Sequence, residues 1–380
     1  MSLRCQGQED KNIHAFELSE PQWQELREVN ARQKHLRMPC CDTSVVLKTS
    51  KLGTQFFAHQ RKGPCTTKPE SAEHLMIKSI VAKTLAQCGW DVSTEIRGQS
   101  SEGEDWVADV IASKGSSRFA VEIQWSRQAI QETYARQSRY KQSGIKALWL
   151  FRHDFPNDED VPAVKVLQVQ DGSFRVMFPS FEVHHYQGGS YPGQTPHFIG
   201  LEEFIRAVCE RRFWYGVFRT GEVATANFKG AFIKCWRCEE WTNVVSEVDI
   251  TSTNNPSPLT INLSELGEAP LLQELLPLDN LKQFKVGRIM NRYSKTVGGE
   301  YLANGCTHCD ALQGNHFLHD ITHRLKVITT HQFTITKAVE AFLTDWEDVY
   351  VEACWRLDLP DKPVEHIHNK PGVIEQPSRT

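Results

Sequence analysis

Residues 71–126 decide the fold, and they read SAEHLMIKSIVAKTLAQCGWDVSTEIRGQSSEGEDWVADVIASKGSSRFAVEIQWS. Ser71 opens a segment whose apolar residues, from Leu75 to Leu85, recur at helical spacing, and Gly89 is a stop signal. Segments with strand character then follow at 91–97, 106–113 and 118–125. The stretch therefore predicts one helix followed by three strands.

A second helix and a fourth strand complete the predicted core. Residues 127–142 are polar and end before Gly144, which favours a helix. The run IKALWLF at 145–151 is continuously apolar, as expected for a strand that is buried on both faces. A strand that returns through a crossover helix is expected to lie parallel to its predecessor. We therefore predict an α/β core with a mixed central sheet flanked by helices.

The composition is that of a globular protein with more than one domain. The 380 residues are 40% hydrophobic and 24% charged, and the net charge of −4 means that nucleic-acid binding would need a local basic patch. No apolar run approaches the roughly 20 residues that span a bilayer. The start, MSLRCQGQEDKN, lacks the apolar segment of a secretion signal. The 11 cysteines are therefore expected to be reduced thiols or metal ligands in the cytoplasm.

Changes in the predicted secondary structure divide the rest of the chain into domains. Hairpins are predicted at 45–47 with 55–57 and at 164–169 with 173–178, and further helices at 21–33, 201–212 and 337–349. The predicted domains are an N-terminal region (1–70), the core (71–155), a connecting α+β region (156–225), a cysteine-bearing domain (226–325) and a C-terminal helix with a mobile tail (326–380).

Two carboxylates and an amide form a candidate site on the second and third predicted strands. Asp109 lies on the former, and Glu122 and Gln124 share one face of the latter. If the strands pair around the turn at 114–116, Asp109 and Glu122 lie at one level and could hold a divalent cation. Such a cation can activate water and neutralise a scissile phosphate, while Gln124 orients the water or a substrate oxygen. The alternative is an ordinary strand pair whose polar residues face solvent.

Several blocks of the core occur in an order and spacing that identify a family. The blocks are SAEHLMIKSIVAKTLAQCGWDVSTEI, WVADV, FAVEIQWS and RQSRYKQSGIKALWLF, and with them residues 39–152 resemble the competence protein CoiA-like family. Members carry a restriction-endonuclease-like PD-(D/E)XK fold and are predicted DNA nucleases. The resemblance implies this fold for the core, DNA as its partner and a bacterial cytoplasmic setting.

The resemblance also assigns roles to individual residues. Asp109 matches the motif aspartate, and Glu122 matches the acidic residue of the (D/E)-x-K pair. Gln124 stands where most nucleases of the superfamily have lysine, so water activation would depend more on the metal. Glu73 resembles the first acidic motif and could hold the metal through water. The alternative for Glu73 is a first-turn glutamate that the helix dipole favours.

Three further polar residues accompany this site. His74 and Lys78 lie one turn apart on the first predicted helix and match polar positions of the family that would contact DNA. The alternative for His74 is a histidine whose hydrogen bonds are satisfied within the fold. Glu95 could supply another carboxylate, although its place near a strand end favours a surface residue.

The helix predicted at 127–142 carries a basic face. Its cations are opposed by one acid, Glu132, and tyrosines accompany them, a combination that suits phosphate contact. The alternative is a solvated helix face. Related nucleases have Gln-x-x-x-Tyr where this chain has Arg136 and Tyr140. The candidate DNA-contacting residues of this helix are Arg127, Arg136, Arg139, Tyr140 and Lys141.

Two Cys-x-x-Cys pairs predict a structural zinc site formed by Cys235, Cys238, Cys306 and Cys309. The segment between the pairs is long, so an insertion at about 244–294 is expected to loop out. A pair of redox motifs is the alternative, but the expected βαβ context is missing. The sequence YLANGCTHC, followed by GNHF at 314–317, resembles the second half of a zinc ribbon. Such a region would stabilise the fold or bind a protein partner.

A second zinc site is a further candidate. The N-terminal module of the family resembles a Cys-Pro-x-Cys finger followed by Phe-Ala-His, and here these positions read MPCC at 38–41 and FAH at 57–59. The first thiol is thus replaced by Met38, and adjacent cysteines rarely both bind one ion. Zinc could be bound by Cys41, His59 and Cys65 together with one further ligand, Cys40 or His74.

These features support two main hypotheses of function. The first is a Mg²⁺- or Mn²⁺-dependent DNA nuclease with Asp109 and Glu122 as metal ligands, Gln124 as orienting group and Glu73 as accessory acid. The second is a catalytically weak or inactive nuclease fold, stabilised by zinc, that binds DNA or a protein. A thiol-based redox protein is a third alternative. Endonuclease or exonuclease action, strand preference and homo-oligomer formation stay open.

Overall fold

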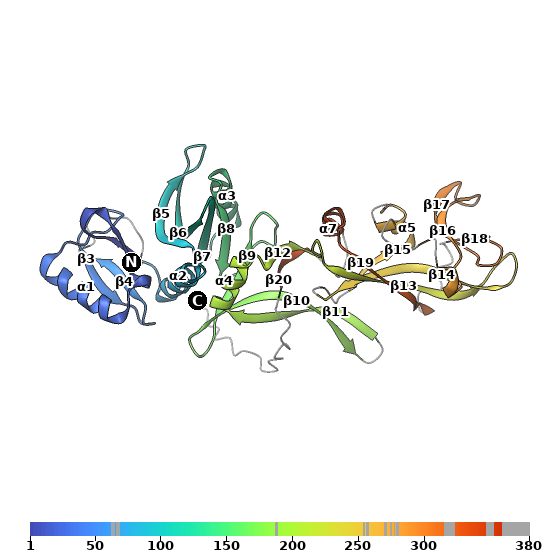
Figure 1. Cartoon of the computed structure of the whole chain (residues 1–380), viewed down its shortest axis with the longest axis horizontal. Coiled ribbons are helices and arrows are strands. Elements are labelled where there is room, and N and C mark those ends of the chain that lie inside the picture. The colour runs from blue at the N-terminus through green and yellow to red at the C-terminus, as the bar shows by residue number, and fades with distance from the viewer. Residues whose placement is uncertain are drawn as a thin grey trace, which may run out of the picture. The chain divides into compact units, whose positions relative to one another are not determined.

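The computed structural model describes residues 1–358 except 62–64, 66–68, 187–188, 254, 256–257, 270–271, 274–275, 277, 279–280, 315–323 and 347–352; the side chains of 10 and 179–196 are also not described. The chain divides into two compact units (Figure 1). Unit 1 comprises Met1–Pro179, Pro196–Tyr215 and Trp355–Thr380, and unit 2 comprises Ser180–Thr195 and Gly216–Cys354. None of the described helices has the length and apolar character needed to cross a membrane.

A seven-stranded mixed sheet forms the centre of the predicted core. Its order is β11 (Gly189–Gly200), β10 (Phe174–Tyr186), β9 (Ala163–Gln168), β8 (Lys146–Phe151), β7 (Ser117–Gln124), β6 (Asp105–Lys114) and β5 (Asp91–Gln99). β5, β6 and β7 pair antiparallel. β8 runs parallel to β7, as predicted for a strand reached through a crossover helix, and β9 runs parallel to β8. The predicted α/β fold with a mixed sheet is confirmed.

Two helices pack into different apolar cores of this sheet. Helix α2 (Ala72–Gln87) buries Leu75 and Val81 in a core that includes Val121 of β7. Helix α3 (Ile130–Gln142) buries Tyr140 in a second core that includes Ala120 of the same strand. Successive side chains of a strand point to opposite faces, so the sheet separates the two cores. The site described below lies where both helices reach β6 and β7.

Two boundaries of the core differ from the sequence prediction. α3 begins at Ile130 and not at residue 127, because Ala129 is extended, with φ −68° and ψ 140°, and serves as the N-cap. Arg127 therefore lies in the preceding loop. The sheet also continues past residue 155, since the predicted hairpin of β9 and β10 joins it through β8. The N-terminal start of α2 is as predicted, with the hydroxyl of Ser71 accepting a backbone hydrogen bond.

The N-terminal elements belong to unit 1 and share the core of α2. They are β1 (Arg4–Gln6), η1 (Gln8–Asp10), β2 (Asn12–His14), η2 (Ala15–Glu17), α1 (Glu20–Gln33), β3 (Val45–Thr49) and β4 (Gln55–His59). β3 and β4 form the predicted hairpin. Leu3, Trp23 and Phe57 are buried together with residues of α2. The boundary expected at residue 70 therefore divides residues that fold as one body.

Three further elements follow the sheet. α4 (Leu201–Cys209) confirms the helix predicted at 201–212, although it ends earlier. Its apolar residues, among them Phe204, join the core that contains α2. β12 (Phe213–Gly216) and β20 (Cys354–Leu357) form a two-stranded sheet.

Unit 2 is built from two antiparallel sheets. The first contains β15 (Leu259–Asn262), β14 (Trp241–Ser252), β13 (Val223–Lys234) and β19 (Lys326–Thr334), and the second β16 (Ile289–Ser294), β17 (Gly299–Gly305) and β18 (Leu312–Gln313). The helical elements are α5 (Leu263–Leu266), η3 (Lys282–Phe284) and α7 (Lys337–Thr344). The segment 244–294, expected to loop out, instead contributes β14, β15 and α5 to the apolar core of the unit.

Some sequence predictions lie outside the described residues. They are the end of the predicted helix at 347–349, the GNHF sequence from residue 315 onward and the tail from residue 360.

Gly98 permits a close contact between β5 and Trp106. The two residues pair across the strands, and an added Cβ at Gly98 would lie 2.1 Å from Cζ2 of the indole. The indole cannot easily move, because its Nε1 donates a hydrogen bond to Ser143 at 2.9 Å. Gly98→Ala is expected to lower the free energy of unfolding by about 1–3 kcal/mol, as overpacking does. Urea denaturation measures this change.

Gly299→Ala is the control, because no described residue lies within 4 Å of a Cβ added there. It is expected to leave the unfolding free energy close to that of the wild type. Equal stability of both variants would show that the contact with Trp106 does not constrain β5.

Candidate active site

Helix α2 directs two polar side chains toward β6. His74 and Lys78 lie one turn apart, as the sequence indicates, and both face Asp109. Nε2 of His74 lies 3.2 Å from Oδ1 of Asp109, and Nζ of Lys78 lies 3.9 Å from the same oxygen. A charged patch therefore interrupts the apolar contact between this helix and the sheet.

Lys78 is fully buried among three carboxylates. Its ammonium group donates to Glu70 and to Glu95 at 2.7 Å each, with Asp109 slightly farther away. Burial would lower the pKa of Lys78, but the charges of Glu95, Glu70 and Asp109 outweigh it and raise the pKa above its usual value. The ammonium group is therefore charged throughout the physiological range and neutralises the surrounding acids.

Glu95 is not the strand-end surface residue that the sequence favours. It lies within β5 with φ 51°, and its carboxylate accepts hydrogen bonds from Lys78, from the Ser2 hydroxyl at 2.6 Å and from the Leu3 N–H at 3.2 Å. Burial would raise the pKa of Glu95, but Lys78 and the other donors lower it overall. The N-terminal segment thus covers this side of the site. Because Ser2 and Leu3 are far from Glu95 in the sequence, the strand pattern around Glu95 could not indicate these contacts.

Asp109 lies where β6 and β7 separate. The residue pairing between the two strands ends at Val110 and Val121, and beyond it Oδ2 of Asp109 accepts the backbone N–H of Ile123 at 2.9 Å. Burial would raise the pKa of Asp109. The positive charges contributed by α2 and the backbone donor outweigh burial and hold the pKa well below its usual range. Asp109 is therefore a fixed anion at the point where backbone pairing stops.

Glu122 is the corresponding carboxylate of β7, and α3 binds it. Its oxygens accept hydrogen bonds from the guanidinium of Arg136 and the hydroxyl of Tyr140. Only 1% of Glu122 is exposed. Burial and the charge of Asp109 raise the pKa of Glu122 to about 7, and Arg136 and Tyr140 offset only part of this rise. Glu122 can therefore exchange a proton near neutral pH.

The two carboxylates lie at neighbouring levels of the sheet but have different partners. Glu122 follows the alternation of β7 and faces α3. In β6 the alternation is interrupted at Asp109, because Ala108 packs in the core of α3 whereas Val110 packs in the core of α2. Asp109 therefore faces α2. Among the described residues, Asp109 and Glu122 do not belong to one group of closely spaced ligand atoms.

Two other predicted site residues have partners elsewhere. Glu73 pairs with Lys51 at 2.8 Å. Consecutive helix residues point about 100° apart, so Glu73 cannot share the direction of His74. Nε2 of Gln124 donates to the carbonyl oxygen of Ser126 at 2.7 Å, which holds this amide at the end of β7.

The predicted basic face of α3 is partly turned inward. Arg136 and Tyr140 both bind Glu122, and Tyr140 is fully buried. The guanidinium of Arg136 also lies 5.2 Å above the ring of Trp149 and donates to the carbonyl oxygen of Val107 at 3.2 Å. Arg136 and Tyr140 therefore fix Glu122 and are not an exposed phosphate contact.

Of the remaining cations of this segment, Arg127 and Lys141 are exposed, whereas the side chains of Arg139 and Arg136 are similarly enclosed, at 25% and 23% exposed. Arg139 and Lys141 have acidic neighbours that the helix sequence alone did not show. Arg139 lies 3.5 Å from Glu104, and Lys141 lies 3.1 Å from Asp160. Arg127 is exposed in the loop before α3.

Glu70, His74 and Asp109 form a group that could hold a metal ion, since their ligand atoms all lie within 4.8 Å of one another. Nε2 of His74 is buried and faces Oδ1 of Asp109 at 3.2 Å. An imidazole nitrogen beside two carboxylates suits a divalent cation. Glu70 was not among the site residues predicted from the sequence. The available signal was the four-residue spacing of Glu70, His74 and Lys78.

The two cysteine pairs of unit 2 meet in one group. Sγ of Cys235 lies 3.7 Å from that of Cys309, and Cys238 and Cys306 are equally close. Each pair occupies the turn after a strand, β13 or β17, and backbone N–H groups of the turns point at two of the sulfurs. Four converging thiols without an open position could hold a structural zinc ion.

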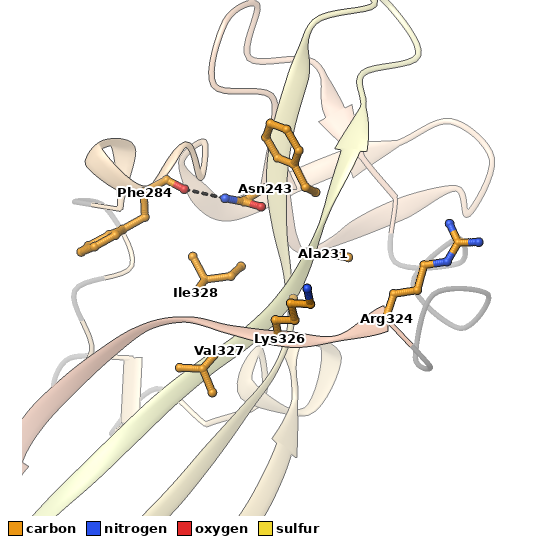
Figure 2. Close-up of a pocket in the computed structure, with 9 residues that line it drawn as sticks. Ala231, Asn243, Phe284, Arg324, Lys326, Val327 and Ile328 are labelled. Atoms are coloured by element: carbon orange, nitrogen blue, oxygen red, sulfur yellow. Dashed lines mark hydrogen bonds between the residues drawn. The ribbon is translucent and has the colours of Figure 1, made fainter. Parts of the chain in front are cut away.

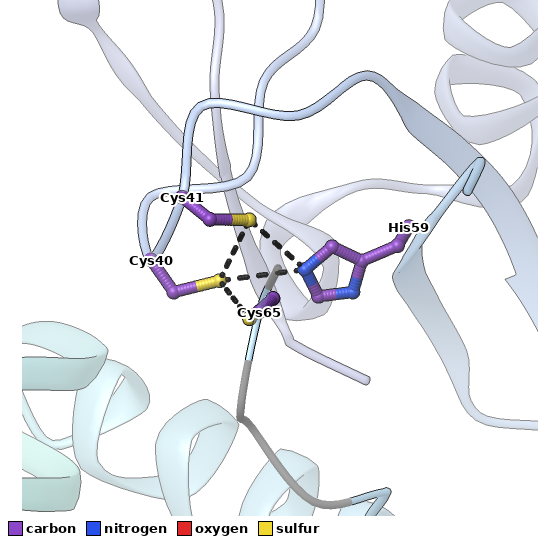
Figure 3. Close-up of side chains that lie close together, drawn as sticks. All are labelled: Cys40, Cys41, His59 and Cys65. Carbon is purple, nitrogen blue, oxygen red and sulfur yellow. Dashed lines mark hydrogen bonds between the residues drawn. The ribbon is translucent and has the colours of Figure 1, made fainter. Parts of the chain in front are cut away.

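A second sulfur-rich group lies in the N-terminal region (Figure 3). Nε2 of His59 lies 3.2 Å from Sγ of Cys41 and 3.5 Å from Sγ of Cys40, which is itself 3.6 Å from Sγ of Cys65. All four residues could hold one metal ion. Cys40 therefore occupies the fourth position, whereas His74 faces Asp109. Both adjacent thiols thus lie in this group.

The mixed sheet, its helices and the polar group at the separation of β6 and β7 define a nuclease-like α/β fold. Residues 70–175 match the family model described as "Competence protein CoiA, nuclease-like domain". The resemblance to the CoiA-like family is thereby confirmed for these residues, which form its nuclease-like domain. The match begins at Glu70, the residue that completes the ligand group.

Comparison with other proteins adds little to this assignment. Two solved chains match, one of them described as "Crystal Structure of Protein of Unknown Function AF1548", with 18% sequence identity and a TM-score of 0.19. The match covers 22% of this chain and 49% of that chain, so this chain spans about half the length of that protein. No curated protein matches.

The raised pKa of Glu122 predicts a specific pH dependence of stability. The folded chain binds this proton with a pKa of about 7, compared with the ordinary 4.5. The resulting stabilisation is fully present below pH 4.5 and is lost as the pH rises through 7. Glu122→Gln removes this loss. From pH 4.5 to 8 the unfolding free energy of the variant should therefore gain about 3 kcal/mol relative to the wild type.

The measurement is urea denaturation of both proteins across this pH range without added Mg²⁺ or Mn²⁺. A difference in unfolding free energy that stays constant with pH would mean that Glu122 is already ionised in the folded protein below pH 7.

Proposed function

We propose that residues 70–175 act as a divalent-metal-dependent DNA nuclease that hydrolyses phosphodiester bonds. The observation that carries the proposal is the group of Glu70, His74 and Asp109 at the separation of β6 and β7, within a domain of a nuclease-like family. The choice of DNA as substrate rests on the resemblance of the core blocks to predicted DNA nucleases.

Asp109 and His74 are the proposed metal ligands, with Glu70 as the third. A nitrogen ligand favours a transition-metal ion over Mg²⁺, and Mn²⁺ also accepts carboxylates readily. When bound, such an ion would lower the pKa of a water molecule and neutralise charge on the scissile phosphate. Glu70 replaces Glu73 as the accessory acid in this proposal, because Glu73 pairs with Lys51.

Glu122 is proposed as the group that accepts the proton released from the attacking water. A general base works best when its pKa lies near the working pH, and burial places the pKa of Glu122 at about 7. Arg136 and Tyr140 hold its carboxylate in one position. The sequence assigned Glu122 to the metal itself, and its contacts with α3 support the role of base instead.

Lys78 supplies positive charge in a site where Gln124 replaces the usual lysine. It is fully buried and bonded to Glu70 and Glu95, so it cannot touch a substrate as the sequence suggested. It is proposed as a positioning residue that keeps Asp109 ionised.

The proposed phosphate contacts are Arg127, Arg139 and Lys141. Exposure supports two of them, since Arg127 lies in an open loop and 76% of the Lys141 side chain is exposed. Arg139, whose side chain is 25% exposed, is kept from the sequence prediction. Exposed ion pairs such as Lys141 with Asp160 contribute little stability, so a phosphate could replace the carboxylate at small cost.

One observation favours the second candidate function, a DNA-binding domain with weak or no cutting activity. Both oxygens of Glu122 are already bonded by α3, and the amide of Gln124 is bonded to Ser126. If these contacts persist when DNA binds, the domain would hold its ligand without a free base.

The sulfur groups are proposed as structural zinc sites. The tetrad of unit 2 would fix the turns after β13 and β17, and the N-terminal group would link Cys65 to His59 at the end of β4. Docking of a protein partner on the zinc-bearing unit and homo-oligomer formation stay predictions from the sequence.

The nuclease proposal predicts cutting of DNA that depends on Asp109. Purified protein is incubated with linear, nicked, single-stranded and branched DNA in Mn²⁺ or Mg²⁺. We expect faster cutting in Mn²⁺, and Asp109→Asn should slow it by at least about 100-fold, as loss of a metal ligand does. His74→Ala should remove the advantage of Mn²⁺ over Mg²⁺.

Asp91→Asn is the control, since Asp91 is an exposed carboxylate at the far end of β5. It should cut like the wild type. The proposal fails if the wild type cuts no substrate with either ion, or if Asp109→Asn cuts at the wild-type rate.

The zinc proposal predicts two tightly bound zinc ions per chain, measured by elemental analysis of protein purified without chelator. Cys306→Ser should remove one zinc and destabilise unit 2, because the remaining thiols cannot complete a tetrahedral site. Cys41→Ser should remove the other. Zinc-free protein, or an unchanged zinc content in both variants, would contradict the assignment.

A further inference from the structure

The hairpin of β13 and β14 carries an exposed face that the nuclease-like domain does not use. Phe232 pairs with Asn243, and Lys234 pairs with Trp241. Directly opposed residues share a side of an antiparallel pair, and residues two apart share a side of one strand. These four side chains therefore project from one side of the hairpin, called here the aromatic face.

Two large rings lie open on the aromatic face. Phe232 and Trp241 stack with their centroids 5.2 Å apart and an interplanar angle of 18°. They are 46% and 48% exposed. A pair of adjacent exposed rings is a marker of a ligand-binding surface, because isolated apolar residues are common at a surface but contiguous ones are not.

Cations surround these rings. The ammonium group of Lys285 lies 5.4 Å from the ring centroid of Phe232. Lys234 and Lys326 are exposed. Within the described part of the chain, none of these three lysines pairs with a carboxylate. The positive charge is therefore available to an anionic ligand.

A cavity of about 690 Å³ adjoins the aromatic face at Phe232 (Figure 2). Its lining includes Phe232, Asn243, Phe284, Arg324 and Lys326, and none of the lining residues that the structure describes is acidic. The figure shows Lys326 at the start of β19, which pairs with β13, Arg324 just before that strand, and the amide of Asn243 bonded to the carbonyl of Phe284.

Gly230 of the lining permits a close approach of β13 to β14. A Cβ at Gly230 would lie 1.8 Å from the carbonyl oxygen of Val244. The acids closest in sequence, Glu239 and Glu240, lie in the turn beyond Cys238 and not in the cavity.

We propose that the aromatic face and the adjoining cavity bind single-stranded DNA. Unpaired bases expose π-faces that can stack on Trp241, and the phosphates between them can pair with Lys285 and Lys326. Bases in a duplex are stacked on each other and cannot use the rings. The choice of DNA over RNA rests on the proposed function of residues 70–175.

The test measures binding by the full chain carrying Asp109→Asn, without added Mg²⁺ or Mn²⁺, so that nothing is cut. Fluorescence anisotropy follows a labelled single strand of about 20 nucleotides, longer than the usual site of such surfaces. Duplex DNA and single-stranded RNA of the same sequence are the other arms. We expect single-stranded DNA to bind tightest.

The variants separate stacking from charge. Phe232→Ala with Trp241→Ala should weaken single-strand binding by at least about tenfold and leave duplex binding unchanged. Lys285→Ala with Lys326→Ala should reduce the slope of log K against log salt by about 1.4, since each phosphate contact contributes about 0.7. Tyr293→Ala, which removes a 61% exposed ring elsewhere in unit 2, is the control and should bind normally. Zinc content and circular dichroism verify folding.

The proposal is overturned if single-stranded DNA does not bind, if RNA or duplex DNA binds better, or if the aromatic variant binds like its parent. The experiments distinguish failure of this binding proposal from failure of the nuclease proposal. Binding that depends on the rings while the wild type cuts nothing would support this face and contradict the nuclease. Cutting by the wild type together with normal binding by the aromatic variant would support the nuclease and contradict binding at this face.

Discussion

The buried ammonium group of Lys78 is the interaction on which the rest of unit 1 depends. It bonds Glu70 before α2 and Glu95 on β5, and it lies beside Asp109 on β6. Removing one partner of a buried ion pair leaves an uncompensated charge and costs about 3–5 kcal/mol. The cluster therefore fixes the helix against two strands. It also fixes the N-terminal segment, because Ser2 and Leu3 bond the same Glu95 carboxylate.

The separation of β6 and β7 turns this structural cluster into a candidate site. Asp109 replaces the missing strand pairing by accepting the N–H of Ile123, and this contact and the cations of α2 keep it ionised. Glu122, one strand away, is buried against α3 and has a pKa of about 7. Two carboxylates of nearly equal intrinsic acidity are thus pushed apart in pKa, which suits one for holding a cation and the other for moving a proton.

Local sequence patterns were enough to predict the framework. The helical period after Ser71, the strand segments between turns and the apolar run before Phe151 gave α2, the central strands and the parallel return. The spacing of Cys235 with Cys238 and of Cys306 with Cys309 indicated a common site, and the structure brings these residues together. These features depend on residues close together in the sequence, or on general rules such as the handedness of crossover connections.

Contacts between distant segments could not be predicted in the same way. Glu95 resembled a surface residue because its partners lie at the N-terminus, and Glu70 precedes the helix pattern altogether. Arg136 and Tyr140 resembled a basic outer face, but their turn of α3 faces Glu122. The aromatic face of unit 2 depends on the register of β13 and β14, which the composition of either strand does not fix.

The most direct test of this account is the position of a metal ion in crystals grown with Mn²⁺, located by its anomalous scattering. The account predicts a manganese ion bonded to Nε2 of His74 and to an oxygen of Asp109. Crystals saturated with Mn²⁺ that show no ion beside His74 and Asp109 would contradict it.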